Sequence, residues 1–220
     1  MRHSKISDYR IKKILHSFSL ELTAVQTAKQ LQLNRHTVDR YYQFFREQIA
    51  AYEERQEMQQ LSGEVEIDES YFGSRHSGDK RGRGTPNKIP VIGILKRRGK
   101  VYATVISDAS AKTLVPIIEK LVSKSKTNVY TDQWRSYDGL VLSGYKHHRI
   151  NHSQEFVQNH HHINGIESFW SYVKRKMRKH NGIARHKFYL YLNESEFRFN
   201  HRNQDLFALL QQFVFNTRIF

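Results

Sequence analysis

The chain contains no cysteine among its 220 residues, and it has no long apolar run. Without cysteine it can form neither a disulfide framework nor a thiolate zinc site. None of its hydrophobic stretches approaches the roughly 20 residues that a membrane-spanning helix needs, and its charged, polar start differs from a signal peptide. We therefore expect a protein of the reducing cytoplasm that has no membrane partner.

Acidic residues are also few: 21 Asp and Glu stand against 36 Lys and Arg, which gives a formal net charge of +15 with histidine neutral. A surplus of this size favours binding to a polyanion through phosphate contacts and counterion release. A basic protein that is merely soluble is the alternative. Hydrophobic residues make up 38% of the chain, enough for a core, and the length allows one large domain plus a small one.

The region 1–60 has helical periodicity throughout, and residues 23–41 have the spacing of a helix-turn-helix. Ala28 suits a close crossing of two helices, although Gln32 occupies the turn where glycine is usual. An ordinary helical hairpin is the alternative. In a helix-turn-helix the N-terminal half of the second helix enters a DNA major groove. That half, with its N-cap, carries Asn34, Arg35, His36, Thr37 and Arg40.

The region 61–220 has a mixed pattern, which predicts an α/β domain with a central sheet and helices at its C-terminal end. The expected elements are a strand, a hairpin, a helix, a strand, a late helix and two final helices, over residues 64–72, 89–95 with 101–106, 110–122, 127–131, 162–177, 188–199 and 206–215. Residues 147–162 are expected to form a loop. Basic residues that could clamp phosphates, or only line solvated turns, are Arg75, Lys80, Arg81, Arg83, Lys88, Arg97, Arg98 and Lys100.

Three acidic residues occupy positions that call for a chemical explanation. Asp68 lies in the middle of the first strand, where aspartate is disfavoured. It shares a face with Glu66, whereas Ile67 and Glu69 share the other. Asp132 follows a later strand, at the edge where α/β proteins bind ligands, although it could simply cap the next segment. Glu167 lies on the late helix beside an apolar stripe, and taken alone it fits a solvated acid.

Acids that converge from separate elements could bind two divalent cations, which prefer oxygen ligands. Two such cations can promote an in-line displacement at phosphorus. Without cations, the same acids would repel one another and raise one another's pKa. The set Asp68, Asp132 and Glu167 therefore favours a metal-dependent phosphoryl-transfer site over three unrelated surface acids.

Several blocks, in the same order, resemble the DDE transposases of insertion sequences of the ISXO-like group. The similarity covers about residues 63–202 and is carried by residues 68–71, 80–85, 129–134, 151–153 and 164–170. This resemblance implies a ribonuclease H-like mixed sheet flanked by helices, preceded here by a small all-α helix-turn-helix region. It also implies a triad of Asp68, Asp132 and Glu167 that binds two Mg²⁺, which Mn²⁺ can replace. Some relatives use asparagine as the third ligand, which makes Asn164 the rival of Glu167.

The resemblance further implies binding of the terminal inverted repeats of an element, DNA strand cleavage, and transfer of the freed 3′-OH to target DNA. Lys174 falls on the family's basic residue, and with Arg178 it is expected to contact the DNA backbone. Many relatives carry an N-terminal cysteine zinc ribbon, so end recognition here is assigned to the helical region. Pairing two DNA ends implies a homodimer or larger assembly. The expected location is a bacterial cytoplasm, with the protein associated with the nucleoid when it is bound to DNA.

Two other functions stay open at this stage. One is a ribonuclease H-like nuclease or resolvase that cuts without joining, but this function gives no role to a sequence-reading N-terminal module. The other is a helix-turn-helix regulator without enzymatic activity, which leaves Asp68 inside a strand unexplained.

Overall fold

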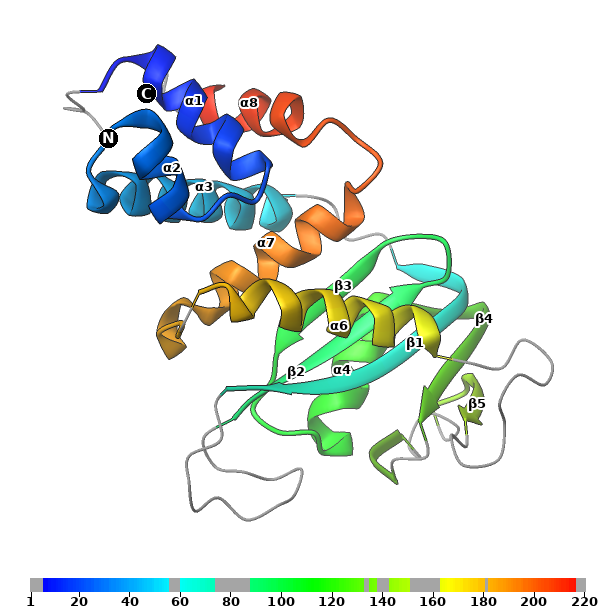
Figure 1. Cartoon of the computed structure of the whole chain (residues 1–220). Coiled ribbons are helices and arrows are strands. Elements are labelled where there is room, and N and C mark those ends of the chain that lie inside the picture. The colour runs from blue at the N-terminus through cyan, green and yellow to red at the C-terminus, as the bar shows by residue number, and fades with distance from the viewer. Residues whose placement is uncertain are drawn as a thin grey trace, which may run out of the picture. The chain divides into compact units, whose positions relative to one another are not determined.

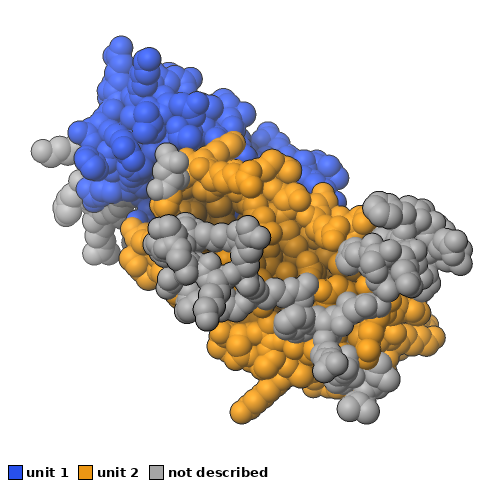
Figure 2. Space-filling model, turned by 60° about the horizontal axis from the view of Figure 1, so that its bottom comes forward, with its two compact units in different colours: residues 1–57, 193–220 blue, residues 58–192 orange. Residues whose placement is uncertain are grey.

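The computed structural model describes seven stretches of the chain, residues 6–55, 60–73, 88–132, 135–137, 143–150, 163–180 and 182–216. They belong to two units (Figure 2), one formed by residues 1–57 with 193–220 and the other by residues 58–192. No helix in the described stretches is both long enough and apolar enough to cross a bilayer.

The first unit is entirely helical (Figure 1). It contains α1 (Asp8–Ser19), α2 (Ala24–Leu31), α3 (Arg35–Arg55), α8 (Leu206–Asn216) and the C-terminal part of α7 (Phe188–Asn200). Apolar side chains that recur every three or four residues face a common core, as amphipathic helices require. This core includes Ile11, Ile14, Leu15, Phe18, Val38, Phe45, Ile49, Phe197, Leu210 and Val214.

A short turn joins α2 to α3, as the spacing of residues 23–41 predicts. Thr23 begins α2 with a capping box, in which its hydroxyl accepts from the Gln26 amide and the Gln26 side chain accepts from the Thr23 amide. Gln32 ends α2 in the left-handed conformation, with φ of 52°, which is the conformation that favours glycine. The Asn34 side chain accepts a hydrogen bond from the His36 amide at 2.8 Å and so caps the start of α3.

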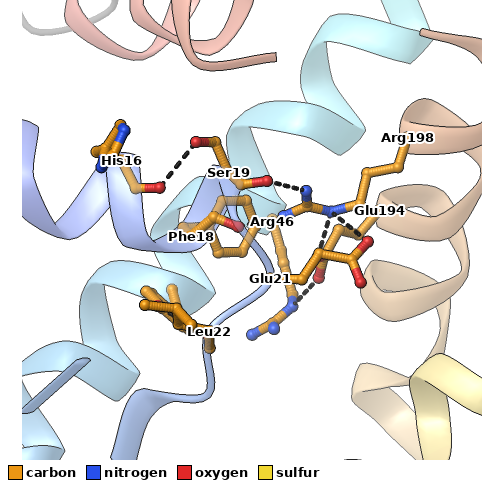
Figure 3. A network of polar contacts seen from close by, with 9 residues as sticks. His16, Phe18, Ser19, Glu21, Leu22, Arg46, Glu194 and Arg198 are labelled. Atoms are coloured by element: carbon orange, nitrogen blue, oxygen red, sulfur yellow. Dashed lines mark hydrogen bonds and ion pairs between the residues drawn. The ribbon is translucent and has the colours of Figure 1, made fainter. Parts of the chain in front are cut away.

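A buried ionic network fastens α7 to α1 and α3 within this unit (Figure 3). The Glu194 carboxylate accepts from Arg46 Nε at 2.7 Å and from Arg198 Nε at 2.8 Å. Arg198 also donates to the carbonyl oxygens of Phe18 and Ser19 at the end of α1. The network therefore satisfies carbonyls that the last turn of a helix leaves without an intrahelical partner.

The second unit is built on a five-stranded sheet with the order β3-β2-β1-β4-β5. The strands are β1 (Leu61–Phe72), β2 (Ile89–Lys96), β3 (Val101–Val105), β4 (Val122–Asp132) and β5 (Lys146–Ile150). The pairs β1–β2 and β2–β3 are antiparallel, whereas β1–β4 and β4–β5 are parallel. The mixed sheet places β1 at its centre, so the side chains of β1 are covered on both faces.

Two helices cover the opposite faces of this sheet (Figure 1). On one face, α4 (Ala111–Leu121) shares a hydrophobic core with the sheet, to which Leu114 and Ile118 of the helix and Val65 and Ile67 of β1 belong. On the other face lies α6 (Asn164–Arg178), which turns its apolar stripe toward the sheet; this stripe includes Ile166, Phe169, Trp170 and Val173. The predicted mixed sheet flanked by helices, preceded by a helical region, is thus confirmed.

Two expectations differ from the structure. Residues 146–150 form the edge strand β5, although 147–162 was expected to be a loop; these polar residues gain their strand conformation from parallel pairing with β4. The C-terminal helices were assigned to the α/β domain, but residues 193–216 group with the N-terminal helices. The reason is that Phe197, Leu210 and Val214 complete the core of the helical unit.

Candidate active site

Asp68 and Asp132 lie on adjacent parallel strands at the centre of the sheet. The register of β1 and β4 pairs Val65 with Val129 and Glu66 with Tyr130, so two residues further along Asp68 is level with Asp132. Neighbouring strands lie about 4.8 Å apart, and residues two apart on a strand share a face. The sheet therefore brings the two aspartates side by side on the face that α6 covers.

Trp170 of α6 contacts Asp68 directly. The indole Nε1 donates a hydrogen bond to Asp68 Oδ2 at 3.1 Å. The register partner of Asp68 on β2 is Gly93, and a Cβ atom there would lie 2.5 Å from Trp170 Cζ2. Gly93 thus lets the indole approach the sheet closely enough to reach Asp68, because a Cβ atom there would force Trp170 to move.

Glu167 and Asn164 lie at the N-terminal end of α6, and both side chains are exposed. Glu167 belongs to the first turn, where a negative charge interacts favourably with the helix dipole. It precedes Trp170 by three residues, so the two side chains are neighbours along the helix. One helix therefore carries Glu167 and the indole that holds Asp68.

The three acids also affect one another electrostatically. The pKa of Asp68 is raised to about 7, chiefly because burial disfavours the charged form. The carboxylates of Glu69, Asp132 and Glu167 add to this increase. Asp132 and Glu167 therefore act on Asp68 as nearby like charges, although they come from separate elements.

The same three acids are the candidate ligands of a metal ion. Across the described residues, no three His, Asp or Glu side chains lie close enough together to hold a metal ion. The donor set itself suits a hard divalent cation, because it consists of carboxylate oxygens and one amide oxygen. A bound cation would offset the like charges that raise the pKa of Asp68.

A second set of polar side chains lies on the same face of the sheet, two residues before Asp68 on β1 and Asp132 on β4. Glu66 of β1 is fully buried, and its carboxylate accepts from Arg97 Nε at 2.8 Å and from the Ile166 amide at 2.9 Å. Arg97 also reaches Glu64 and lies over the Tyr130 ring, 4.1 Å from its centre. From the sequence, Arg97 was a candidate for contact with DNA phosphates. In the structure its guanidinium binds Glu66 and Glu64 instead.

Other cations that the sequence proposed for DNA contact have varied surroundings. Lys174 is exposed on α6, with its ammonium 5.9 Å from the centre of the Phe72 ring, and Arg178 and Arg98 are exposed too. In the helical unit, Asn34, Arg35, His36 and Arg40 are exposed and Thr37 is partly buried; Arg35 pairs with Asp39 at 3.4 Å. Lys88 is partly buried just before β2. Arg75, Lys80, Arg81 and Arg83 lie outside the described residues.

The sequence did not show several contacts at or near this site. The parity of β1 put Glu66 beside Asp68, but nothing in the pattern showed its bonds to Arg97 and α6. Trp170 packs against Phe72, but no local pattern showed its bond to Asp68. On the opposite face, the buried Tyr137 hydroxyl donates to Glu69, a contact across 68 residues of sequence that no local pattern encodes.

Comparison with known proteins shows which family and which relatives the chain is similar to. Residues 60–200 match the family described as the ISXO2-like transposase domain. A transposase-like protein of Haemophilus influenzae is 47% identical over 116 residues, which span 52% of this chain and 94% of that protein. A protein in the transposable element ISH50 of Halobacterium salinarum is 28% identical over 155 residues, 63% of this chain and 52% of that protein.

Solved structures similar to this chain include the strand transfer complex of Mos1, at 12% identity and a TM-score of 0.36, covering 97% of this chain and 76% of that one. A complex of the Mos1 mariner paired ends with Mn has a TM-score of 0.35, also at 12% identity, and covers 97% of this chain and 80% of that one. The family match extends over more than half of the sequence and contains every residue of the candidate site. The chain therefore belongs to the ISXO2-like transposase family.

Proposed function

We propose that this transposase-family chain binds the ends of an insertion sequence and catalyses metal-dependent DNA strand cleavage and strand transfer. One observation carries the proposal: Asp68 and Asp132 stand level on adjacent parallel strands, and Trp170 ties to Asp68 the helix that bears Glu167. On this basis we assign Asp68, Asp132 and Glu167, which come from separate elements, to one site.

Asp68, Asp132 and Glu167 would hold the metal ions, with Asn164 as the alternative third ligand. Two Mg²⁺ ions, or Mn²⁺ in their place, would supply charge to activate the attacking oxygen and to stabilise the leaving oxygen of the displaced phosphodiester. The protein residues orient this ligand set. Trp170 fixes the rotation of the Asp68 carboxylate through its hydrogen bond, and burial within the sheet limits the access of water to that side chain.

The exposed side of α6 provides a path for the DNA backbone. Glu167, Ser171, Lys174 and Arg178 recur at helical spacing, and all four side chains are exposed. Lys174 lies seven residues beyond Glu167, roughly 10 Å along the helix axis. We assign Lys174 and Arg178 to phosphates beyond the scissile one, together with Arg98 at the hairpin tip, Lys88, and the basic residues 75–83.

Recognition of the DNA ends is assigned to the helical unit. The Asn34 cap fixes the start of α3 and leaves Arg35, His36 and Arg40 exposed on its first turns. The N-terminal residues of the second helix are those that read base edges in helix-turn-helix proteins. Because cleavage and joining of two ends require two active sites, we propose a dimer or larger assembly on DNA.

The test uses labelled DNA duplexes that carry the inverted repeats flanking the gene, a supercoiled target plasmid, and Mg²⁺. Wild-type protein is expected to join the 3′ ends to the plasmid. The variants Asp68→Ala and Asp132→Ala are expected to bind the ends but give no joined product. Cutting without joining would identify a nuclease, and binding without either reaction would identify a regulator; each result would overturn the proposal.

A further inference from the structure

The N-terminus of α6 lacks a cap from its own sequence. Its N-cap residue is Ile163, whose side chain cannot accept a hydrogen bond. The first amides of a helix have no intrahelical acceptor, and leaving one without a partner in a buried place costs free energy. In this structure Glu66 supplies the acceptor, because its Oε2 accepts from the Ile166 amide at 2.9 Å.

The Glu66 carboxylate is held from its other side as well. Its Oε1 accepts from Arg97 Nε at 2.8 Å, and Glu66 has no exposed surface. The Arg97 guanidinium is kept in place by Glu64 and by the face of the Tyr130 ring. Glu66 therefore cannot rotate away from α6 without losing an ion pair that is shielded from water.

Gly165 makes this approach of strand and helix sterically feasible. A Cβ atom at Gly165 would lie 2.8 Å from Glu66 Oε2 and 2.5 Å from Leu95 Cδ2. A side chain there would force Leu95, the Glu66 carboxylate or the first turn of α6 to shift. A glycine in the first turn of a helix is otherwise unfavourable, so the close contact is the physical reason for it.

We propose that Glu66 is a positioning residue that sets the first turn of α6, and with it Glu167, relative to Asp68. The role rests on the strand-transfer function proposed above. Glu66 and Asp68 are two residues apart on the same face of β1, and Glu167 directly follows the residue whose amide Glu66 binds. One strand thus carries one acid of the site and anchors the helix turn that carries another.

The test separates this role from mere stability. The double variant Glu66→Leu with Arg97→Met replaces the buried ion pair by apolar side chains, a change that often preserves stability. We expect it to melt near the wild-type temperature but to join DNA ends about 10- to 100-fold more slowly at saturating DNA. Its affinity for the ends should be unchanged, because Glu66 is fully buried and the Arg97 guanidinium is engaged by Glu66 and Glu64.

Two further variants provide the controls. Leu114→Ala, in the core on the α4 face, should be the less stable protein but should join at the wild-type rate below its melting temperature; Ile118→Val is the milder choice if Leu114→Ala does not fold. Glu66→Gln keeps an oxygen for the Ile166 amide and should therefore join DNA ends faster than the double variant does. Joining at the wild-type rate by the double variant, or an equal loss in Leu114→Ala, would overturn the role.

A second readout does not depend on DNA joining. Hydrogen exchange followed by NMR should show the Ile166 amide protected in the wild type and exposed in the double variant, with the Val173 amide protected in both. Unchanged protection of Ile166 would overturn the role of Glu66 even in an active enzyme. Failure of the wild type to join ends would refute the proposed function instead, and the exchange result would distinguish the two failures.

Discussion

The indole Nε1 of Trp170 donates a hydrogen bond to Asp68 Oδ2 at 3.1 Å, across 102 residues of sequence. This bond ties α6 to the central strand at the level of Asp68 and Asp132. Trp170 also packs against Phe72 and above Gly93, so its position is fixed on several sides. The contact makes the orientation of one acid depend on the helix that carries another.

Trp170→Phe keeps an aromatic ring but removes the donor. We expect strand transfer to fall about 10- to 100-fold, since the Asp68 carboxylate loses its fixed rotation. Stability should fall by about 1–2 kcal/mol, the usual cost of losing a hydrogen bond and part of the packing. Joining kinetics and thermal denaturation measure the two effects.

Tyr145→Phe is the matched control, because it removes a buried hydrogen bond to the Val122 carbonyl. It should lose a similar amount of stability but no joining activity. Equal rates for the wild type and Trp170→Phe would show that the indole only fills space.

Asp68→Asn should stabilise the metal-free protein at neutral and alkaline pH. The folded state raises the pKa of Asp68 from 3.8 to about 7, so it binds this proton more tightly than the unfolded chain does. The stability from this group is complete below pH 3.8 and is lost as pH rises to about 7. Above that pH the asparagine variant should gain on the order of 1–3 kcal/mol, since one pKa unit corresponds to about 1.4 kcal/mol.

Chemical denaturation in EDTA between pH 4 and 8 measures this difference. The gain should shrink toward zero near pH 4, and a gain independent of pH would refute the assignment to Asp68. Saturating Mg²⁺ should raise the melting temperature of the wild type more than that of the variant, because a ligand stabilises the state that binds it.

Glu194→Ala should destabilise the helical unit by about 3–5 kcal/mol, because it leaves two buried arginines, Arg46 and Arg198, without their shared carboxylate. Urea denaturation measures the change. Asp39→Ala breaks the exposed pair with Arg35 and should cost about 0.5 kcal/mol or less. Similar losses for the two variants would contradict a central role for the buried network.

Arg40→Ala and Lys174→Ala should weaken DNA binding in different ways. Arg40 on α3 is assigned to base edges, so its loss should cost about 1–3 kcal/mol with the terminal repeat and less with unrelated DNA. Lys174 on α6 is assigned to phosphate, so its loss should reduce binding to both sequences. It should also lower the slope of log K against log salt concentration by about one. Salt titrations monitored by fluorescence anisotropy measure both; identical profiles would refute the division of roles.

Local patterns in the sequence predict much of this fold. The turn between α2 and α3, the β2–β3 hairpin and α6 follow from periodicity and capping within each segment. The parity of β1 correctly separates Asp68 and Glu66 from Ile67 and Glu69. These features depend on residues close together in the chain.

The features that the sequence could not provide depend on distant partners. β5 is polar and is stabilised by pairing with β4. Arg97 lies in a turn rich in cations, and only the buried Glu66 beside it explains its inward direction. The grouping of residues 193–216 with the N-terminal helices rests partly on Glu194, which binds Arg46, 148 residues away, and on Phe197, which packs against Tyr52.

The most direct test of the active site compares Glu167→Gln and Asn164→Ala in the joining of labelled DNA ends to plasmid with Mg²⁺. Glu167→Gln should bind the ends normally but lose at least about 100-fold in joining rate, as expected when a charged group acting in the transition state is removed. Asn164→Ala should retain most of the activity. Full joining by Glu167→Gln, or joining by the wild type in EDTA, would contradict a centre built from Asp68, Asp132 and Glu167.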